Sequence, residues 1–160
     1  MDMSRIKEKI LSCINDAEHL YSQLILLVGE SGTNKTNLIK SFAKEHDLVV
    51  INLNQKLSEK LIDLSPAQRS IKLSKLVNEI LDKCTSKPIV LDNIEILFDQ
   101  NLKQDPLRLL LGMSRNQVII ATWNGRFKNN RLTYAEIGHP EYLYYDKPDS
   151  LIMELNDLNT

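Results

Sequence analysis

The sequence predicts an α/β fold, a three-layer sandwich in which helices cover both faces of a mostly parallel sheet. Short apolar segments alternate with amphipathic segments of helical period along the 160 residues. The segment 24–28 is apolar at every position, which is typical of a strand buried on both faces of a parallel sheet. Polar residues follow three of the apolar segments directly, at the edge where parallel sheets bind ligands.

The elements are expected in the following order. Ile6, Ile10 and Ile14 recur at helical spacing and predict an amphipathic helix over residues 3–21. Ser65 and Gln68 form the pattern of a capping box at the start of a helix. Apolar runs predict strands at 24–28, 48–53, 88–92 and 117–122, and periodicity predicts helices at 35–46, 66–83 and 106–114.

The C-terminal part carries turn residues among tyrosines. Residues 125–160 are expected to form a hairpin, a last strand at 142–145 and a tail. Ile152, Leu155 and Leu158 suggest a short terminal helix, which is too small for a helical lid domain. The whole chain, 1–160, is therefore expected to be one domain with an N-terminal helix over 1–21.

The composition excludes some classes of protein. Hydrophobic residues make up 42% and charged residues 26%, as in an ordinary globular domain. The net charge of −1 argues against a basic nucleic-acid module, although a local basic patch is compatible with it. Cys13 and Cys84 lie far apart, which favours reduced thiols. No apolar run approaches the roughly 20 residues that span a bilayer, so a cytoplasmic protein without membrane contact is expected.

A phosphate-binding loop is the main functional motif. It follows the first predicted strand, opens a helix and resembles a Walker A loop, which binds ATP and Mg2+. Its backbone N–H groups and helix N-terminus would bind the triphosphate, Lys35 would reach the outer phosphates, and Thr36 would hold the metal. The expected nucleotide-binding residues are Gly29, Glu30, Ser31, Gly32, Thr33, Asn34, Lys35 and Thr36.

Asn34 departs from the Walker A pattern, which has glycine directly before the lysine. Glycine suits that position because it accepts positive φ. Asn adopts positive φ more readily than most other residues, so the loop shape is expected to survive. The substitution leaves two alternatives open: altered nucleotide binding with hydrolysis, or binding without turnover.

Two further strand ends carry candidate catalytic residues. Asp92 ends an apolar strand and Glu95 follows three residues later, which resembles the Walker B motif of P-loop ATPases. Asp92 would hold the shell of the metal, and Glu95 would orient and deprotonate the attacking water. Asn124 follows the next strand and resembles a polar sensor residue that helps to place this water. An Asp after a strand is also commonly a plain helix cap.

Arginines that neutralise transition-state charge are expected near the same edge. Arg115, Arg126 and Arg131 are the candidates, because they flank the fourth predicted strand and the hairpin after it, and such an arginine would act in a neighbouring subunit's site. A solvated role remains the alternative for each. His139 is expected to be a loop residue.

The sequence resembles the BrxF family, the small P-loop proteins of type III BREX phage-defence systems, over nearly the whole chain and most specifically over residues 91–142. The similarity is carried by the runs 91–99, 104–110, 114–116, 121–125, 132–135 and 138–142. It implies an AAA+-like ATP-binding component that works beside a DNA methyltransferase and other defence proteins. The expected partners are further copies of the chain or other BREX proteins, with DNA contact only through the complex. A kinase is a third class, but no segment predicts its acceptor pocket and basic lid.

Overall fold

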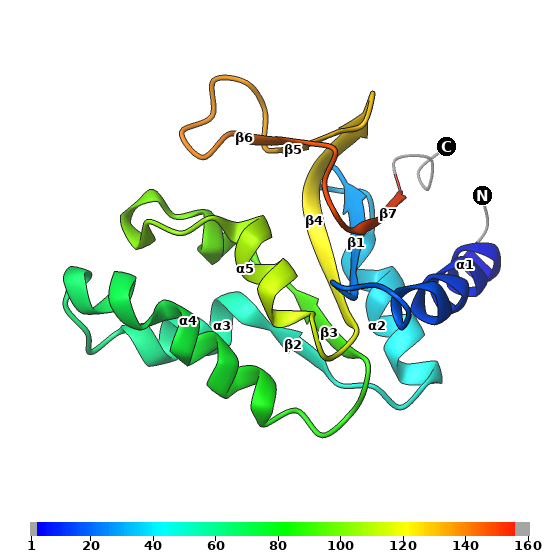
Figure 1. The fold of residues 1–160 in the computed structure, drawn as a ribbon, viewed down its shortest axis with the longest axis horizontal. Helices are drawn as coiled ribbons and strands as arrows, with labels where there is room; N and C mark the ends of the chain where they lie inside the picture. Colours follow the sequence, from blue (N-terminus) through cyan, green and yellow to red (C-terminus); the bar gives the residue numbers. More distant parts are fainter. Residues whose placement is uncertain (1–2, 156–160) are drawn as a thin grey trace.

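The computed structural model describes residues 3–155, which form a three-layer α/β sandwich (Figure 1). Ser65 and Gln68 form the expected capping box of α4. The helices are α1 (Met3–Ala17), α2 (Lys35–Glu45), α3 (Leu53–Leu61), α4 (Pro66–Asp82) and α5 (Pro106–Met113), with short 3-10 helices η1 (Glu95–Phe98) and η2 (Gln100–Leu102). The strands are β1 (Leu24–Gly29), β2 (Val50–Asn52), β3 (Ile89–Asp92), β4 (Ile119–Lys128), β5 (Arg131–Tyr134), β6 (Leu143–Asp146) and β7 (Leu151–Glu154).

The main sheet has the order β2-β3-β4-β1-β7, and all of its neighbouring strands are parallel. β4 therefore lies between β1 and β3. The register pairs Gly29 at the end of β1 with Asn124 on β4. This pairing brings the start of the predicted phosphate loop beside the predicted sensor residue.

The side chains of β1 point into two hydrophobic cores, one on each face of the sheet. Leu24, Leu26 and Val28 point into a core that also contains the apolar faces of α3, α4 and α5. Ile25 and Leu27 point into a second core, which α1 and α2 cover. A strand that is apolar at every position is stable here because helices cover both of its faces.

β4 continues beyond the parallel sheet. Its outer part pairs antiparallel with β5, and β5 pairs with β6, so a three-stranded extension stands above the sheet (Figure 1). Trp123 anchors this extension, because its Nε1 donates to the carbonyl of Thr133 at 2.9 Å and its ring meets Phe98 and Tyr134 edge to face.

Several predicted boundaries differ from the structure. The first helix ends at Ala17, the second strand is shorter than 48–53, and helix α3 was not predicted. The strand predicted at 142–145 is β6 and belongs to the antiparallel extension. The prediction of a terminal helix is wrong for the described residues, because Leu151–Glu154 is a strand beside β1. Leu158, the third residue of the predicted pattern, lies outside the described residues.

None of the helices within residues 3–155 is long and apolar enough to cross a membrane.

Candidate nucleotide site

The phosphate loop connects β1 to α2 in a tight curve. Gly32 has a φ of +92°, and the Thr33 hydroxyl donates to the carbonyl of Glu30 at 2.7 Å. A Cβ added at Gly29 would lie 2.5 Å from the Thr33 hydroxyl oxygen. The loop thus depends on glycine at both positions, once for conformation and once for space.

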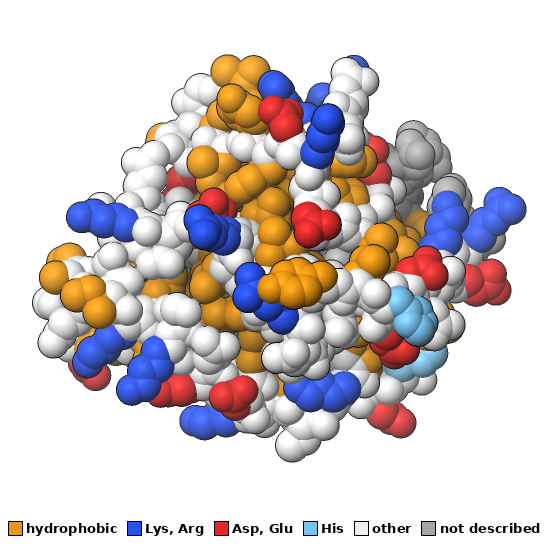
Figure 2. All heavy atoms as spheres, in the orientation of Figure 1, with side chains coloured by type: hydrophobic (Ala, Val, Ile, Leu, Met, Phe, Trp, Pro, Cys, Tyr) orange, Lys and Arg blue, Asp and Glu red, His pale blue; other side chains and the backbone are white. Residues whose placement is uncertain are grey.

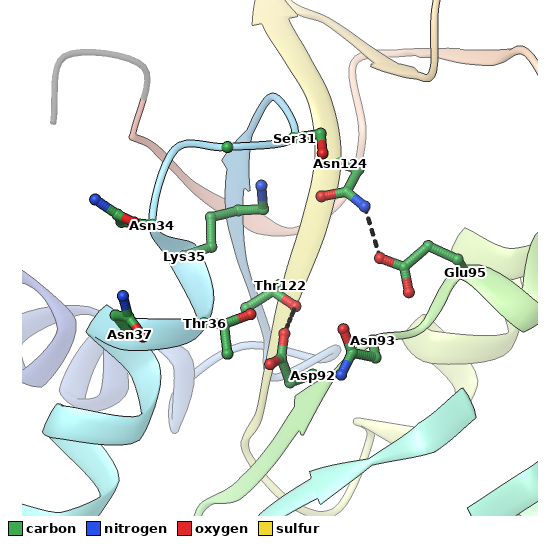
Figure 3. Close-up of a pocket in the computed structure, with 11 residues that line it drawn as sticks. Ser31, Asn34, Lys35, Thr36, Asn37, Asp92, Asn93, Glu95, Thr122 and Asn124 are labelled. Carbon is green, nitrogen blue, oxygen red and sulfur yellow. Dashed lines mark hydrogen bonds between the residues drawn. The ribbon is translucent and has the colours of Figure 1, made fainter. Parts of the chain in front are cut away.

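Asn34 adopts the conformation that the sequence predicted. Its φ of 60° and ψ of 25° lie in the left-handed region, immediately before α2 begins. The side chain is exposed and points away from the Lys35 amine and from Asp92 (Figure 3). Asn34 therefore provides the backbone shape of the missing glycine without inserting its amide between the lysine and the acidic residues.

Lys35 is held inside the loop. It is only 6% exposed, and its Nζ donates to the carbonyls of Gly29 and Glu30 at 2.8 Å each. Burial lowers the pKa of Lys35, and the carboxylates of Glu95, Asp92 and Glu30 oppose this shift. An ammonium held by neutral carbonyls and facing acidic residues can exchange these weak partners for phosphate oxygens.

Asp92 has an unused buried oxygen. The residue is 3% exposed, and its Oδ1 accepts a hydrogen bond from the Thr122 hydroxyl at 2.6 Å. Its Oδ2 is buried and has no partner within the described part of the chain. The Thr36 side chain lies beside Thr122 and Asp92 (Figure 3). A carboxylate oxygen and a hydroxyl are the hard ligands that Mg2+ takes while keeping several waters, so these residues fit the ion.

Glu95 lies between two amides. Its Oε1 accepts a hydrogen bond from Asn124 at 2.6 Å, as Figure 3 shows, and its Oε2 accepts one from Asn54 at 3.0 Å. Asn54 also accepts from the backbone N–H of Ile96 at 2.7 Å, so it fixes both the side chain of Glu95 and the start of η1. A paired, oriented carboxylate of this kind suits a general base.

Sequence reasoning missed Thr122, which donates to Asp92, and it missed Asn54. Asn54 lies in the first turn of α3, directly after β2, and its N–H donates to the carbonyl of Asn93 at 2.8 Å. A pattern that could have revealed it is the polar pair Asn52 and Asn54 at the end of a predicted strand. The rule that ligands lie at the carboxyl ends of parallel strands applies to this strand as well.

The structure separates two of the candidate arginines. Arg126 lies on the outer part of β4, with 63% of its side chain exposed, and forms an ion pair with Glu30 of the phosphate loop. Arg115 precedes β4, beside Gln23 at the amino end of β1, and its guanidinium lies over the ring of Tyr21. The expectation that Arg115 lies near the nucleotide edge is therefore wrong, because a residue before a strand lies at the opposite edge of the sheet.

Two further residues have structural partners. Arg131 pairs with Asp146 across β5 and β6 at 2.7 Å. His139 accepts a hydrogen bond at Nδ1 from the N–H of Glu141, as expected of a loop residue.

One pocket of about 340 Å³ brings the predicted residues together. The carboxyl ends of β1 and β3 and the middle of β4 meet there, so residues distant in sequence line the same pocket. Its lining includes Ser31, Gly32, Asn34, Lys35, Thr36, Asp92, Glu95, Thr122 and Asn124.

Comparisons with known proteins provide only a distant likeness. No family model matches the chain, and no curated protein matches it. Among solved structures, the one titled "Structure of C. elegans PCH-2" aligns with 96% of this chain and 42% of that chain. The identity is 16% and the TM-score 0.48, so the chain spans less than half the length of that protein and shares little sequence with it.

Proposed function

We propose that the chain is a Mg2+-dependent ATPase of AAA+-like type. The observation that carries this proposal is the convergence of Lys35, Asp92, Glu95 and Asn124 on one pocket at the N-terminus of α2. A helix N-terminus with a glycine-containing loop binds phosphate through its backbone N–H groups. The carboxylate and amide on the opposite wall are what in-line attack by water requires.

The residues have separate tasks in this proposal. The loop 29–36 binds the triphosphate, and Lys35 contacts its outer phosphates. Thr36 and Asp92 hold Mg2+, which neutralises charge on the phosphate oxygens when it is bound. Glu95 accepts the proton of the attacking water, while Asn124 and Asn54 keep the carboxylate in position.

Phosphate release by the purified protein tests hydrolysis. We expect Mg2+-dependent release that falls by about 10²-fold or more in Glu95→Gln, because the amide cannot accept the proton. Glu59→Gln on the exposed face of α3 is the matched control and should keep full activity. Equal rates for Glu95→Gln and the unmodified protein would rule out Glu95 as the base.

A non-hydrolysing nucleotide-binding subunit is the second candidate. Asn34 in place of glycine favours it, because the loop departs from the pattern of active ATPases. In that case Mg-ATP binds, and phosphate release stays at the level of Glu95→Gln.

The resemblance of residues 91–142 to the BrxF family supports a role in a cytoplasmic BREX phage-defence complex. Catalysis would then depend on assembly with other copies or BREX proteins, with Arg126 as the candidate that reaches a neighbouring site. Specific activity should rise with protein concentration or with a partner, and mixing Glu95→Gln with Arg126→Ala should restore part of it. Specific activity that is flat over a hundredfold concentration range, without recovery on mixing or with partners, would show that each chain acts alone.

Phage plating tests the cellular role. Cells that carry the complete BREX system should lose protection when the chain carries Lys35→Ala. Unchanged protection would contradict a role for nucleotide binding in defence.

A further inference from the structure

A second pocket adjoins the nucleotide site. It has a volume of about 910 Å³ and shares Ser31 and Asn124 with the first pocket. Its walls are the phosphate loop, the antiparallel extension and the loop 135–142. Hydrophobic side chains are visible between the extension and the helical layer in Figure 2. The assigned roles of the nucleotide site leave this space unused.

The charge of the second pocket is unbalanced. Three carboxylates line it, those of Glu30, Glu136 and Glu141, against one arginine, Arg126, and the imidazole of His139. Arg126 is already paired with Glu30. Glu136 and Glu141 thus provide negative charge in excess of the cation present. A cationic group from outside would be attracted here.

Tyr134 supplies an aromatic wall of the second pocket. It is 5% exposed, lines the second pocket and stacks on Phe98 of η1. Burial raises the pKa of Tyr134, and the negative charges of Glu95 and Glu141 raise it further.

We propose that the second pocket binds a basic polypeptide segment, which inserts a lysine or arginine side chain between the carboxylates of Glu136 and Glu141 and the rings of Tyr134 and Tyr142. The aliphatic stem of such a side chain suits an apolar wall, and its charge suits carboxylates and aromatic faces. Ile137 on the rim is 87% exposed, which provides an apolar contact for the backbone and neighbouring residues of the segment. This apolar rim favours a polypeptide over a small polyamine.

Bound nucleotide should strengthen this interaction. The triphosphate adds negative charge beside Ser31 and Asn124, which both pockets share. Linkage then requires that the basic segment and the nucleotide each raise the affinity for the other. This coupling rests on the proposed ATP site, whereas the binding of the segment alone does not.

The test uses a fluorescein-labelled hexa-arginine peptide, with fluorescence anisotropy measured with and without Mg2+ and a nonhydrolysable ATP analogue. Glu136→Gln/Glu141→Gln should weaken binding by about tenfold, since two partner charges are lost. Glu8→Gln/Asp82→Asn removes the same charge from exposed positions on α1 and α4 and should change affinity by less than about twofold.

Two results would overturn the proposal: equal weakening in both double variants, which indicates general charge attraction, or spermine binding as tightly as the peptide. Peptide binding without any nucleotide binding would instead contradict the ATP site and leave the second pocket standing. Nucleotide binding without peptide binding would contradict the second pocket and leave the ATP site standing.

Discussion

The two halves of β4 differ in burial and in strand pairing. From Ile119 to Trp123 every residue is buried; β1 pairs parallel with this whole stretch, and β3 pairs parallel with residues 119–121 on the other side. From Asn124 to Lys128 burial alternates, and the strand pairs with β5 antiparallel. The site residue Asn124 lies at the junction. The comparison indicates that the inner half provides stability and rigidity, while the outer half shapes the space beside the site.

Removing a core side chain from the inner half should give the largest effect. Ile120→Ala should lower the free energy of unfolding by about 2–5 kcal/mol, because Ile120 is fully buried between β1 and β3. Phe127→Ala in the outer half should cost less, since Phe127 is only partly buried. Urea denaturation of both variants measures the difference, and equal losses would contradict the division of β4.

Gly125 tests the outer half directly. A Cβ added there would lie 1.8 Å from the carbonyl oxygen of Thr133, so Gly125→Ala should separate β4 from β5. We expect a loss of about 1–3 kcal/mol in the free energy of unfolding and increased solvent exposure of Trp123. Gly112→Ala in α5 meets nothing within 4 Å and should stabilise the protein by about 0.5–1 kcal/mol. Unchanged stability and tryptophan fluorescence in Gly125→Ala would show that the extension tolerates the methyl group.

Sequence patterns predicted the inner half and the phosphate loop well, for a physical reason. A strand covered on both faces must be apolar throughout, so its sequence is easily identified. A loop rich in small residues between a predicted strand and a predicted helix is compatible with few conformations. Asn34 was also expected to adopt positive φ, and it does, with a φ of 60°.

The missed features depend on tertiary contacts. Leu53, Leu57 and Leu61 follow helical spacing and could have revealed α3, but the direct β2–α3 junction hides the boundary. The terminal pattern suggested a helix because Ile152 and Leu155 are three residues apart. The segment forms β7 instead, because there it hydrogen-bonds with the backbone of β1 on the side that β4 does not occupy. The second pocket could not be predicted, since the extension that encloses it is arranged by tertiary packing.

Asn54 tests whether the missed residue acts at the site. Asn54→Ala removes a donor to Glu95 and an acceptor of the Ile96 N–H, and we expect turnover to fall by about 10–100-fold. Nucleotide affinity should change little, because Asn54 does not line the first pocket. Gln55→Ala, at the next and exposed position, is the control. Phosphate-release kinetics with unchanged turnover in Asn54→Ala would limit Asn54 to a structural role.

Asn34→Gly should have the smallest effect. The backbone already has the required conformation and the side chain points away from the lysine. Glycine removes the cost of the left-handed conformation but increases the freedom of the unfolded chain. ATP affinity should therefore rise by no more than about threefold. A large loss of affinity in the folded variant would show that the Asn34 amide contacts phosphate.

The nucleotide site is best tested by calorimetric titration of Mg-ATP into the unmodified protein, Lys35→Ala and Lys40→Ala. We expect saturable binding that weakens by about tenfold or more in Lys35→Ala, because a charged hydrogen bond contributes about 1.5–3 kcal/mol. Lys40 is exposed on the same helix, so Lys40→Ala should bind like the unmodified protein. Unchanged affinity in a folded Lys35→Ala variant, or no binding by the unmodified protein, would contradict the nucleotide site.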